Sequence, residues 1–136
     1  MSSTDKPTVR VVAAVIECDG KYLITQRMPH AVMPLLWEFP GGKVELGETD
    51  AVALARELAE EMAIAVHVRD ELMAVVQEYN DYVIDFHVYL CDMLSDTIQR
   101  VGINDFKWVT SDELDRYPFP AADQATVRAL IDEKPN

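Results

Sequence analysis

The sequence predicts an α/β fold in which a mixed β-sheet is covered by helices on both faces. Apolar, β-branched runs typical of strands come before, between and after two segments that have the apolar spacing of amphipathic helices. Strands and helices interleaved in this way favour helices packed onto one sheet. The chain has 136 residues, of which 49% are apolar, so it is long enough to form one core. We therefore expect a single domain over residues 1–136, beginning with a flexible, polar tail over residues 1–8.

The first half of the chain predicts a β-hairpin, a loop and then a helix. Asp19 and Gly20 separate two apolar runs and are typical of a tight hairpin turn. The sequence Pro40-Gly41-Gly42 ends a short extended segment and favours a turn before the helix. In order, we expect strands at residues 9–18, 21–26 and 37–39, with a loop at 29–36, and a helix at 49–62.

The second half of the chain predicts more strands and a closing helix. Asn80 and Asp81 separate two strand-rich runs and favour another turn. Ser111 begins a short helical turn with acidic residues next to it, where the helix dipole favours them. A proline pair then breaks the chain before the last helix. In order, we expect strands at residues 64–79, 82–92 and 106–109, a helical turn from Ser111, and a helix at 121–132.

The strongest functional signal is a glycine loop that leads into a helix with three acidic residues, Glu57, Glu60 and Glu61. A helix turns by about 100° per residue, so these positions share one face, apart from the apolar stripe. Carboxylates that lie side by side repel one another unless a cation lies between them. Oxygen ligands of this kind suit a hard divalent cation, Mg²⁺ or Mn²⁺. The pattern therefore predicts a metal site beside a loop of the size that binds phosphate.

An acidic helix face exposed to water is the alternative interpretation of these carboxylates. Three neighbouring features favour the metal site instead. A Gly-Gly turn precedes the helix, Glu48 lies in the loop between them, and Arg56 lies within the acidic cluster. Together they indicate a built site rather than a solvated surface.

The same residues resemble the Nudix box, the sequence motif of the Nudix hydrolase family. The motif reads Gly, five residues, Glu, seven residues, Arg-Glu, an aliphatic residue, any residue, Glu-Glu, any residue, Gly and an aliphatic residue. The chain matches it at Gly42, Glu48, Arg56, Glu57, Leu58, Glu60, Glu61 and Ile64. Ala63 stands where the motif has its late glycine. The family's glycine ends the helix in a left-handed conformation, where alanine costs about 1 kcal/mol more.

The resemblance covers most of the chain, about residues 9–130, and is to MutT-like members of the family. Outside the box it is carried by three stretches: Leu23-Ile24-Thr25-Gln26-Arg27, Trp37-Glu38-Phe39-Pro40-Gly41-Gly42 and Tyr117-Pro118-Phe119-Pro120-Ala121-Ala122-Asp123. It implies the Nudix-type α/β/α sandwich with a mixed sheet. It also implies a Mg²⁺-dependent nucleoside triphosphate pyrophosphohydrolase, with Mn²⁺ as a substitute, that releases a nucleoside monophosphate and pyrophosphate.

The resemblance further implies a role for each charged residue of the box. Glu57, Glu60 and Glu61 would bind the metal together with the carbonyl oxygen of Gly41. Glu57 is the first choice for the base that deprotonates the attacking water, and Glu60 is the alternative. Arg56 would hold the acidic loop residue and the loop in register with the helix.

A further acidic metal ligand often precedes the late tryptophan of MutT-like enzymes. Trp108 aligns with that tryptophan and places Gly102 at the ligand position. Asp105 is close in sequence and is a candidate replacement. On a strand that ends at Trp108, Asp105 is equally compatible with a place on the surface.

Three residues match positions that face the nucleobase in MutT-like proteins: Arg27, Phe39 and Asp123. Arg27 offers directed donors, and Phe39 can stack on a ring. Asp123 can accept from ring N–H groups, or donate if it is protonated. The alternatives are core packing for Phe39 and a dipole-stabilised helix start for Asp123.

Three other residues are candidates for contact with the substrate. Lys43 is a candidate phosphate ligand, and a solvated lysine is the alternative. Trp37 and Met33 would line the opening of the nucleobase pocket, or they would pack within their own loop.

The nucleobase is left open by these residues. The relatives that read 8-oxoguanine with an amide have Asn where this chain has Asp123, and Asp there resembles the CTP-preferring relatives. Removal of oxidised dGTP is therefore the leading hypothesis, and CTP or a modified dCTP is the alternative substrate. A non-catalytic, Nudix-like nucleobase-binding module is the third hypothesis. The complete set of Glu57, Glu60 and Glu61 argues against it.

The composition bears on partners and location. A net charge of −12 argues against binding long nucleic acid, which needs a cationic surface. No run approaches 18 apolar residues, so we expect no membrane span, and the first residues lack the apolar centre of a signal peptide. We expect a cytoplasmic enzyme with a nucleoside triphosphate as substrate, present as a monomer or a homodimer.

Overall fold

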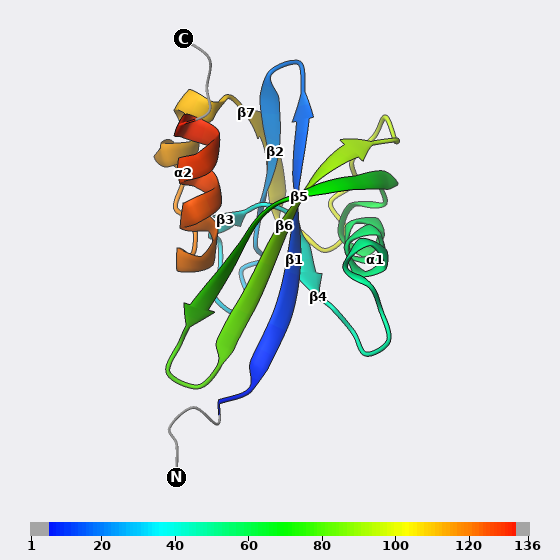
Figure 1. The fold of residues 1–136 in the computed structure, drawn as a ribbon. Helices are drawn as coiled ribbons and strands as arrows, with labels where there is room; N and C mark the ends of the chain where they lie inside the picture. The colour runs from blue at the N-terminus through cyan, green and yellow to red at the C-terminus, as the bar shows by residue number, and fades with distance from the viewer. Residues whose placement is uncertain (1–5, 133–136) are drawn as a thin grey trace.

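The computed structural model of the chain describes residues 6–132, which form one mixed sheet with helices on either side (Figure 1). The strands of the sheet are β1 (Thr8–Cys18), β2 (Lys21–Gln26), β3 (Trp37–Glu38), β4 (Gly41–Lys43), β5 (Val66–Glu78), β6 (Val83–Met93) and β7 (Asp105–Val109). The helices are α1 (Asp50–Met62) and α2 (Gln124–Asp132), with 3-10 turns η1 (Ser111–Arg116) and η2 (Ala121–Asp123). The predicted α/β class is confirmed.

The central strand β1 joins the two parts of the sheet. It runs parallel to β6, from the pair Thr8 and Val83 to the pair Ile16 and Cys91. Its other edge pairs antiparallel with β4 along one stretch and with β2 at the hairpin end. The strand order is β3-β2-β1-β6-β5, with β4 attached to β1 and β7 attached to β2. One parallel pair among antiparallel pairs makes the sheet mixed, as predicted.

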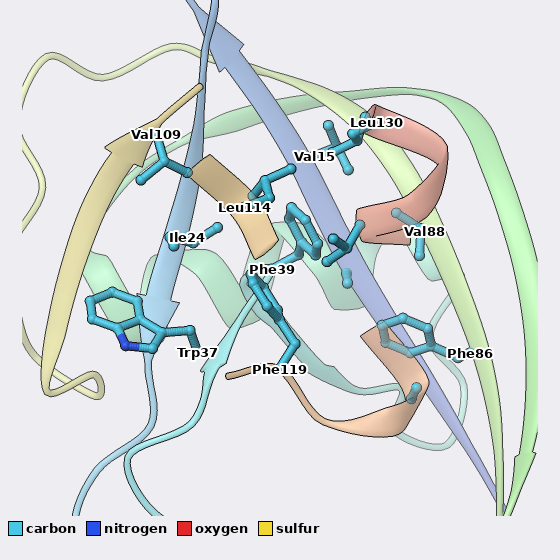
Figure 2. Packing of buried hydrophobic residues seen from close by; sticks show 13 residues of the cluster. Val15, Ile24, Trp37, Phe39, Phe86, Val88, Val109, Leu114, Phe119 and Leu130 are labelled. Atoms are coloured by element: carbon cyan, nitrogen blue, oxygen red, sulfur yellow. The ribbon is translucent and has the colours of Figure 1, made fainter. Parts of the chain in front are cut away.

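Alternate side chains of β1 point to opposite faces of the sheet, and each face has its own core. On one face, α1 buries an apolar stripe of Leu54, Leu58 and Met62 against β1 and β2. Full burial of such a side chain contributes about 2 kcal/mol. On the other face, α2 packs over a second cluster that includes Val15, Phe39, Phe86, Val88, Phe119 and Leu130 (Figure 2). Figure 1 shows the two helices on opposite sides of the sheet.

The helix α1 begins and ends where the box pattern predicts. Thr49 caps its start, since the Thr49 hydroxyl oxygen accepts from the Val52 N–H at 3.2 Å. Ala63 ends it in the left-handed region, at φ 57° and ψ 36°, and its N–H donates to the Ala59 carbonyl at 2.9 Å. The alanine therefore adopts the strained conformation expected of the glycine it replaces.

Most boundaries differ from the predicted ones by one to three residues. Thr8, expected in a flexible tail over residues 1–8, is the first residue of β1, because β6 extends far enough to pair with it. Lys6 is also held, by an ion pair of 2.6 Å with Glu78, whereas residues 1–5 lie outside the described residues. The helix expected at 121–132 begins with the 3-10 turn η2, and β5 begins at Val66 rather than at 64.

The strand β4 is an element that the sequence did not predict. Its residues Gly41 and Gly42 read as a turn, because glycine disfavours strands. The structure instead presses Gly41 against β1, where a Cβ would lie 1.9 Å from the Val12 carbonyl oxygen. Close backbone approach therefore explains the glycine better than a turn does.

No helix within residues 6–132 is long and apolar enough to cross a membrane.

Candidate active site

A glycine strand and the helix α1 meet at the centre of the site. Gly42 of β4 lies directly against the carboxylate of Glu57 on α1. A Cβ at position 42 would lie 2.3 Å from Glu57 Cδ, closer than real Cβ contacts allow. Glycine is therefore required at Gly42 for the Glu57 carboxylate to sit against the β4 backbone. The Nudix-like glycines and the acidic helix thus form one structural unit.

Arg56 links the loop before α1 to the acidic residues on α1. Its Nε and Nη2 donate to Glu48 at 2.6 and 3.0 Å, and Nη2 also donates to the Lys43 carbonyl at 3.0 Å. Its Nη1 donates to Glu57 at 3.1 Å and to Glu60 at 3.2 Å. The bond from Arg56 holds the pKa of the Glu48 carboxyl below its ordinary value. Arg56 therefore orients carboxylates of the loop and of the helix at the same time.

The three acidic residues of α1 lie in different environments. Glu60 is the outermost, with 60% of its side chain exposed, compared with 17% for Glu57. Burial raises the pKa of Glu57 in spite of the bond from Arg56. Burial raises the pKa of Glu61 to about 9, with the negative charges of Glu38 and Glu57 adding to it. Glu61 also has a buried oxygen, Oε1, without a hydrogen-bond partner.

These observations fit a divalent cation between the carboxylates. A buried carboxylate oxygen without a partner is costly, and neighbouring negative charges increase that cost. A cation bound there would relieve both, and carboxylate and carbonyl oxygens are the ligands that hard divalent cations prefer. Glu57 and Glu61 line the cleft together with the glycine strand, whereas Glu60 lies on the helix surface. Within residues 6–132, the side chains do not form a ready-made group of three metal ligands, so Glu60 would have to move to join Glu57 and Glu61 at one cation.

A cleft of about 820 Å³ opens beside this unit and collects most of the residues that the sequence indicated. The predicted residues that line it are Arg27, Met33, Phe39, Gly41, Lys43, Glu57, Glu61 and Asp123. Its other lining residues come from β1, β3, β4, the β5–β6 hairpin, the loops before β3 and before α1, and the segment at η2. The cleft is therefore assembled from segments that are far apart in the sequence.

Asp123 lies at the end of the cleft away from α1. Only 4% of the residue is exposed, and its Oδ1 has no hydrogen-bond partner among the described residues. Burial raises the pKa of Asp123 well above its ordinary value, and the negative charge of Glu38 adds to the shift. The backbone N–H of Phe39 donates to the carboxyl and acts in the opposite direction. Burial favours the neutral form of this carboxyl, which can donate one hydrogen bond as well as accept.

Phe39 and Arg27 shape the wall next to Asp123. The Phe39 ring is 2% exposed and stacks on Phe119 with 5.5 Å between ring centroids, so it belongs to the core as well as to the cleft wall. Arg27 Nη1 donates to Glu38 at 3.0 Å, and Arg27 Nε donates to the Val32 carbonyl at 2.6 Å. Arg27 therefore ties the loop before β3 to the cleft.

Sequence reasoning missed Glu38 and the two tyrosines of the β5–β6 hairpin. Burial raises the pKa of Glu38, which lies between the metal-binding end and the base end of the cleft. The sequence offered one indication of Glu38, its position between the two candidate residues Trp37 and Phe39. Tyr79 and Tyr82 also line the cleft, with stacked rings 5.0 Å apart. No local pattern marks them, because the β5–β6 register alone brings them there.

The structure does not bring Asp105 or Trp37 into the cleft. Asp105 Oδ1 accepts from the Phe106 N–H at 2.8 Å and from Arg100 at 3.5 Å. Trp37 is buried in the core and packs edge-on against Tyr117.

Gly102, in contrast, lies directly against α1. Its N–H donates to the Glu61 carbonyl at 2.9 Å, and a Cβ there would lie 3.4 Å from Glu61 Cα. The position of the absent loop ligand is thus beside Glu61, and Asp105 is elsewhere.

Comparisons with known proteins agree with this architecture. A family model described as NUDIX domain matches residues 11–129. An 8-oxo-dGTP diphosphatase of Haemophilus influenzae is 37% identical over 135 residues, which cover 97% of this chain and 98% of the relative. A CTP pyrophosphohydrolase of Escherichia coli is 35% identical over 123 residues, covering 90% and 91%. The crystal structure of a MutT Nudix hydrolase from Burkholderia pseudomallei superposes with a TM-score of 0.81 at 26% identity, covering 90% and 98%.

Hydrolases of this family generally use divalent metals, and the glycine strand, the acidic helix and the cleft match that requirement. The family match spans most of the chain and includes all of the residues of the box. The chain therefore belongs to the Nudix family and is a MutT-like hydrolase.

Proposed function

We propose that the protein is a nucleoside triphosphate pyrophosphohydrolase that uses Mg²⁺, with Mn²⁺ as a substitute. One observation carries the proposal. A single cleft has Glu57 and Glu61 at one end and the buried carboxyl of Asp123, near Arg27, at the other. The metal-binding groups and the groups that would contact the nucleobase are therefore separated. This separation suits a nucleotide whose phosphates lie at α1 and whose nucleobase lies at η2.

Glu57, Glu60, Glu61 and the Gly41 carbonyl would hold the cation. The bound cation supplies charge neutralisation at the phosphates and a lower pKa for water. Water attacks phosphorus, the bridging P–O bond between the α- and β-phosphates breaks, and pyrophosphate leaves. Glu57 takes the proton from the water. It lines the cleft, whereas Glu60 is mostly exposed, so the geometry supports Glu57 over the alternative base.

Arg56 acts on this chemistry through the carboxylates it binds. Its bonds to Glu57 and Glu60 limit the rotamers of both side chains. Held carboxylates need less reorganisation when substrate binds, which lowers the barrier. Lys43 lines the cleft next to Gly42 and would bind the triphosphate.

The base end of the cleft supports two substrates. A neutral carboxyl has one donor and one acceptor, so Asp123 can pair with guanine through O6 and N1–H, or with cytosine through N3 and the amino group. Rings stack on the aromatic side chains of the wall. Oxidised dGTP is the leading substrate, in line with the Haemophilus influenzae relative. CTP or a modified dCTP is the alternative, in line with the Escherichia coli relative. Because these nucleotides form a cytoplasmic pool, we place the enzyme in the cytoplasm.

A nucleotide panel tests the proposal. Pyrophosphate release from 8-oxo-dGTP, dGTP, CTP and dCTP with Mg²⁺ gives kcat/KM for each. We expect 8-oxo-dGTP to rank first. Asp123→Ala should change kcat/KM by about 5- to 150-fold between purine and pyrimidine substrates, since an unpaired polar group in a pocket costs about 1–3 kcal/mol. Asp123→Asn should tilt the ranking further toward 8-oxo-dGTP.

The matched control is Asp132→Asn, an exposed aspartate on α2. It should leave the ranking unchanged. If both Asp123 variants instead lose all substrates in proportion, Asp123 serves only to hold η2 and α2 in place. Its proposed role in recognition would then be wrong.

A further inference from the structure

A second arginine, Arg10 of β1, contacts both ends of the loop before α1. The β4–α1 loop comprises residues 44–49. We propose that Arg10 and Asp50 form a positioning pair for hydrolysis, which fixes both ends of this loop to the sheet and thereby aligns Glu48, Arg56 and the carboxylates of α1. The inference rests on the proposed function. Arg10 lies outside the Nudix box, and Asp50 occupies a position that the motif leaves unspecified.

The side chains of the pair meet through two parallel bonds. Arg10 Nε donates to Asp50 Oδ1 at 2.7 Å, and Arg10 Nη2 donates to Asp50 Oδ2 at 2.7 Å. The Tyr89 hydroxyl of β6 also donates to Asp50 Oδ2, and Arg10 Nη1 reaches Asp85 of β6 at 3.2 Å. A two-pronged arginine–carboxylate pair is stronger and more directional than a single contact. The first residue of α1 is thus bound to two neighbouring strands.

The backbone of Arg10 holds the other end of the loop. Its carbonyl oxygen accepts from the Val44 N–H at 3.0 Å. One residue therefore binds residue 44 through its backbone and residue 50 through its side chain. Between these points, Arg56 binds Glu48 and the Lys43 carbonyl. Two arginines on different elements hold the same short loop.

The loop has little else to hold it. Leu46 is fully exposed, and Glu45 and Gly47 are exposed as well. Gly47 adopts φ 86°, where glycine carries no steric penalty but leaves the chain free. Val44 packs against the apolar cluster on the α1 face, but residues 45–49 bury no apolar side chain and rely on polar contacts for order. Removing the contacts at Asp50 should therefore loosen the loop and, through Glu48, the side chain of Arg56.

Arg10 is a positioning residue and not a catalytic one. It does not line the cleft, and it touches none of the carboxylates at the metal-binding end. The hydrogen bonds from Arg10 lower the pKa of Asp50 to about 2, so the pair is charged at neutral pH. Its loss should reduce kcat and raise the Mg²⁺ concentration needed. Base selection, which depends on the far end of the cleft, should not change.

The experiment combines amide hydrogen exchange with steady-state kinetics on R10A, D50A and the R10A/D50A double variant. The matched control is R69A, which removes another surface arginine–aspartate pair, Arg69 with Asp92 at 3.1 Å, on β5 and β6. R10A and D50A should each speed exchange of the loop amides by about 10-fold relative to R69A. They should lower kcat by about 10-fold, with KM and the nucleotide ranking within about twofold. R10K, which keeps the charge but not the two-pronged geometry, should recover only part of kcat.

The double variant decides whether the residues act as a pair. If they do, the loss of kcat in R10A/D50A should be much smaller than the product of the two single losses, because the contact between Arg10 and Asp50 is removed by either substitution. Losses that multiply in the double variant would overturn the proposal. So would loop exchange in R10A equal to that in R69A, or faster exchange with unchanged kcat, which would make the pair purely structural. D50N, which keeps the size of the side chain, repeats the test if R10A does not fold.

The two proposals fail in different ways. If the wild-type protein releases no pyrophosphate from any nucleotide, the proposed function fails. The exchange comparison between R10A and R69A still decides whether Arg10 orders the loop. If the wild type is active and R10A matches it in both measurements, only the positioning pair is wrong.

Discussion

Glu57 lies between the backbone of Gly42 and the guanidinium of Arg56, at the mouth of the cleft. Glu57→Gln keeps the shape of the side chain and removes its charge. We expect kcat to fall by about 10² to 10⁴, the usual range for losing a general base. The melting temperature should not fall, because burial disfavours the charged form of Glu57. Steady-state pyrophosphate release and thermal unfolding measure the two effects.

Glu60→Gln is the comparison for that experiment. Glu60 shares Arg56 with Glu57 but is mostly exposed. A Glu57→Gln enzyme within about threefold of wild type, together with a larger loss in Glu60→Gln, would move the base to Glu60.

Asp123 should make stability depend on pH. Its pKa in the folded chain lies well above the ordinary value of 3.8, so the folded state binds the proton more tightly than the unfolded state. The resulting stabilisation is complete below about pH 4 and is lost as pH rises toward the folded pKa. Over that window the unfolding free energy should fall by about 1.4 kcal/mol per pH unit more in wild type than in Asp123→Asn. Urea unfolding between pH 4 and 7 measures it, and equal slopes would show that Asp123 is ionised.

The sequence identified some residues of the site and could not identify others, for a physical reason. The acidic residues of the box lie on one helix, where spacing alone determines which side chains share a face. Arg10 and Glu38 reach their places through strand pairing with segments distant in the sequence, opposite Asp85 and Thr25 respectively. Local residue spacing does not determine the register between distant strands. The partners of such residues are therefore identified only in the folded structure.

At the scale of elements, the end of α1 carries a stored strain. Ala63 has a left-handed backbone that glycine adopts freely. Ala63→Gly should therefore raise the unfolding free energy by about 1 kcal/mol. Ala59→Gly, at an exposed position inside the same helix, should lower it by about 1 kcal/mol. Chemical denaturation of both variants measures the difference, and a loss of stability in Ala63→Gly would contradict the reading of this cap.

The loop before β7 permits a test of the metal ligands. Asp105 binds the Phe106 N–H and Arg100 and does not line the cleft, so Asp105→Asn should leave the Mg²⁺ titration of activity unchanged. Gly102 lies beside Glu61, and Gly102→Glu should lower the Mg²⁺ concentration needed for half-maximal activity. A higher requirement in Asp105→Asn would restore Asp105 as a ligand that reaches the cleft when metal binds.

Elements with a clear period were predicted well, and those defined by close contact were not. The apolar stripe and the box pattern predicted a helix at 49–62, and the structure has α1 at Asp50–Met62, with Thr49 as its cap. The strand β4 was missed because its two glycines locally favour a turn. In the structure, the lack of a Cβ allows β1 and Glu57 to approach the β4 backbone closely. Thr8 was assigned to the tail because it precedes the apolar run of β1, and only its pairing with Val83 of β6 identifies it as a strand residue.

At the scale of the whole molecule, the two cores place α1 and α2 on opposite faces, with the sheet between them (Figure 1). The cleft runs from α1 along β4 and β1 to η2, so it joins groups from both layers. The fold class followed from the alternation of strands and helices. The cleft did not, because it exists only once the sheet brings these segments together.

Identification of the phosphorus products with and without metal tests the central claim most directly. Phosphorus NMR of 8-oxo-dGTP treated with the protein in Mg²⁺ should show one pyrophosphate and one nucleoside monophosphate per substrate consumed. Excess EDTA should abolish the reaction, because the acidic cleft alone repels a triphosphate. Equal turnover in EDTA, or release of orthophosphate and a nucleoside diphosphate, would contradict a metal-dependent pyrophosphohydrolase.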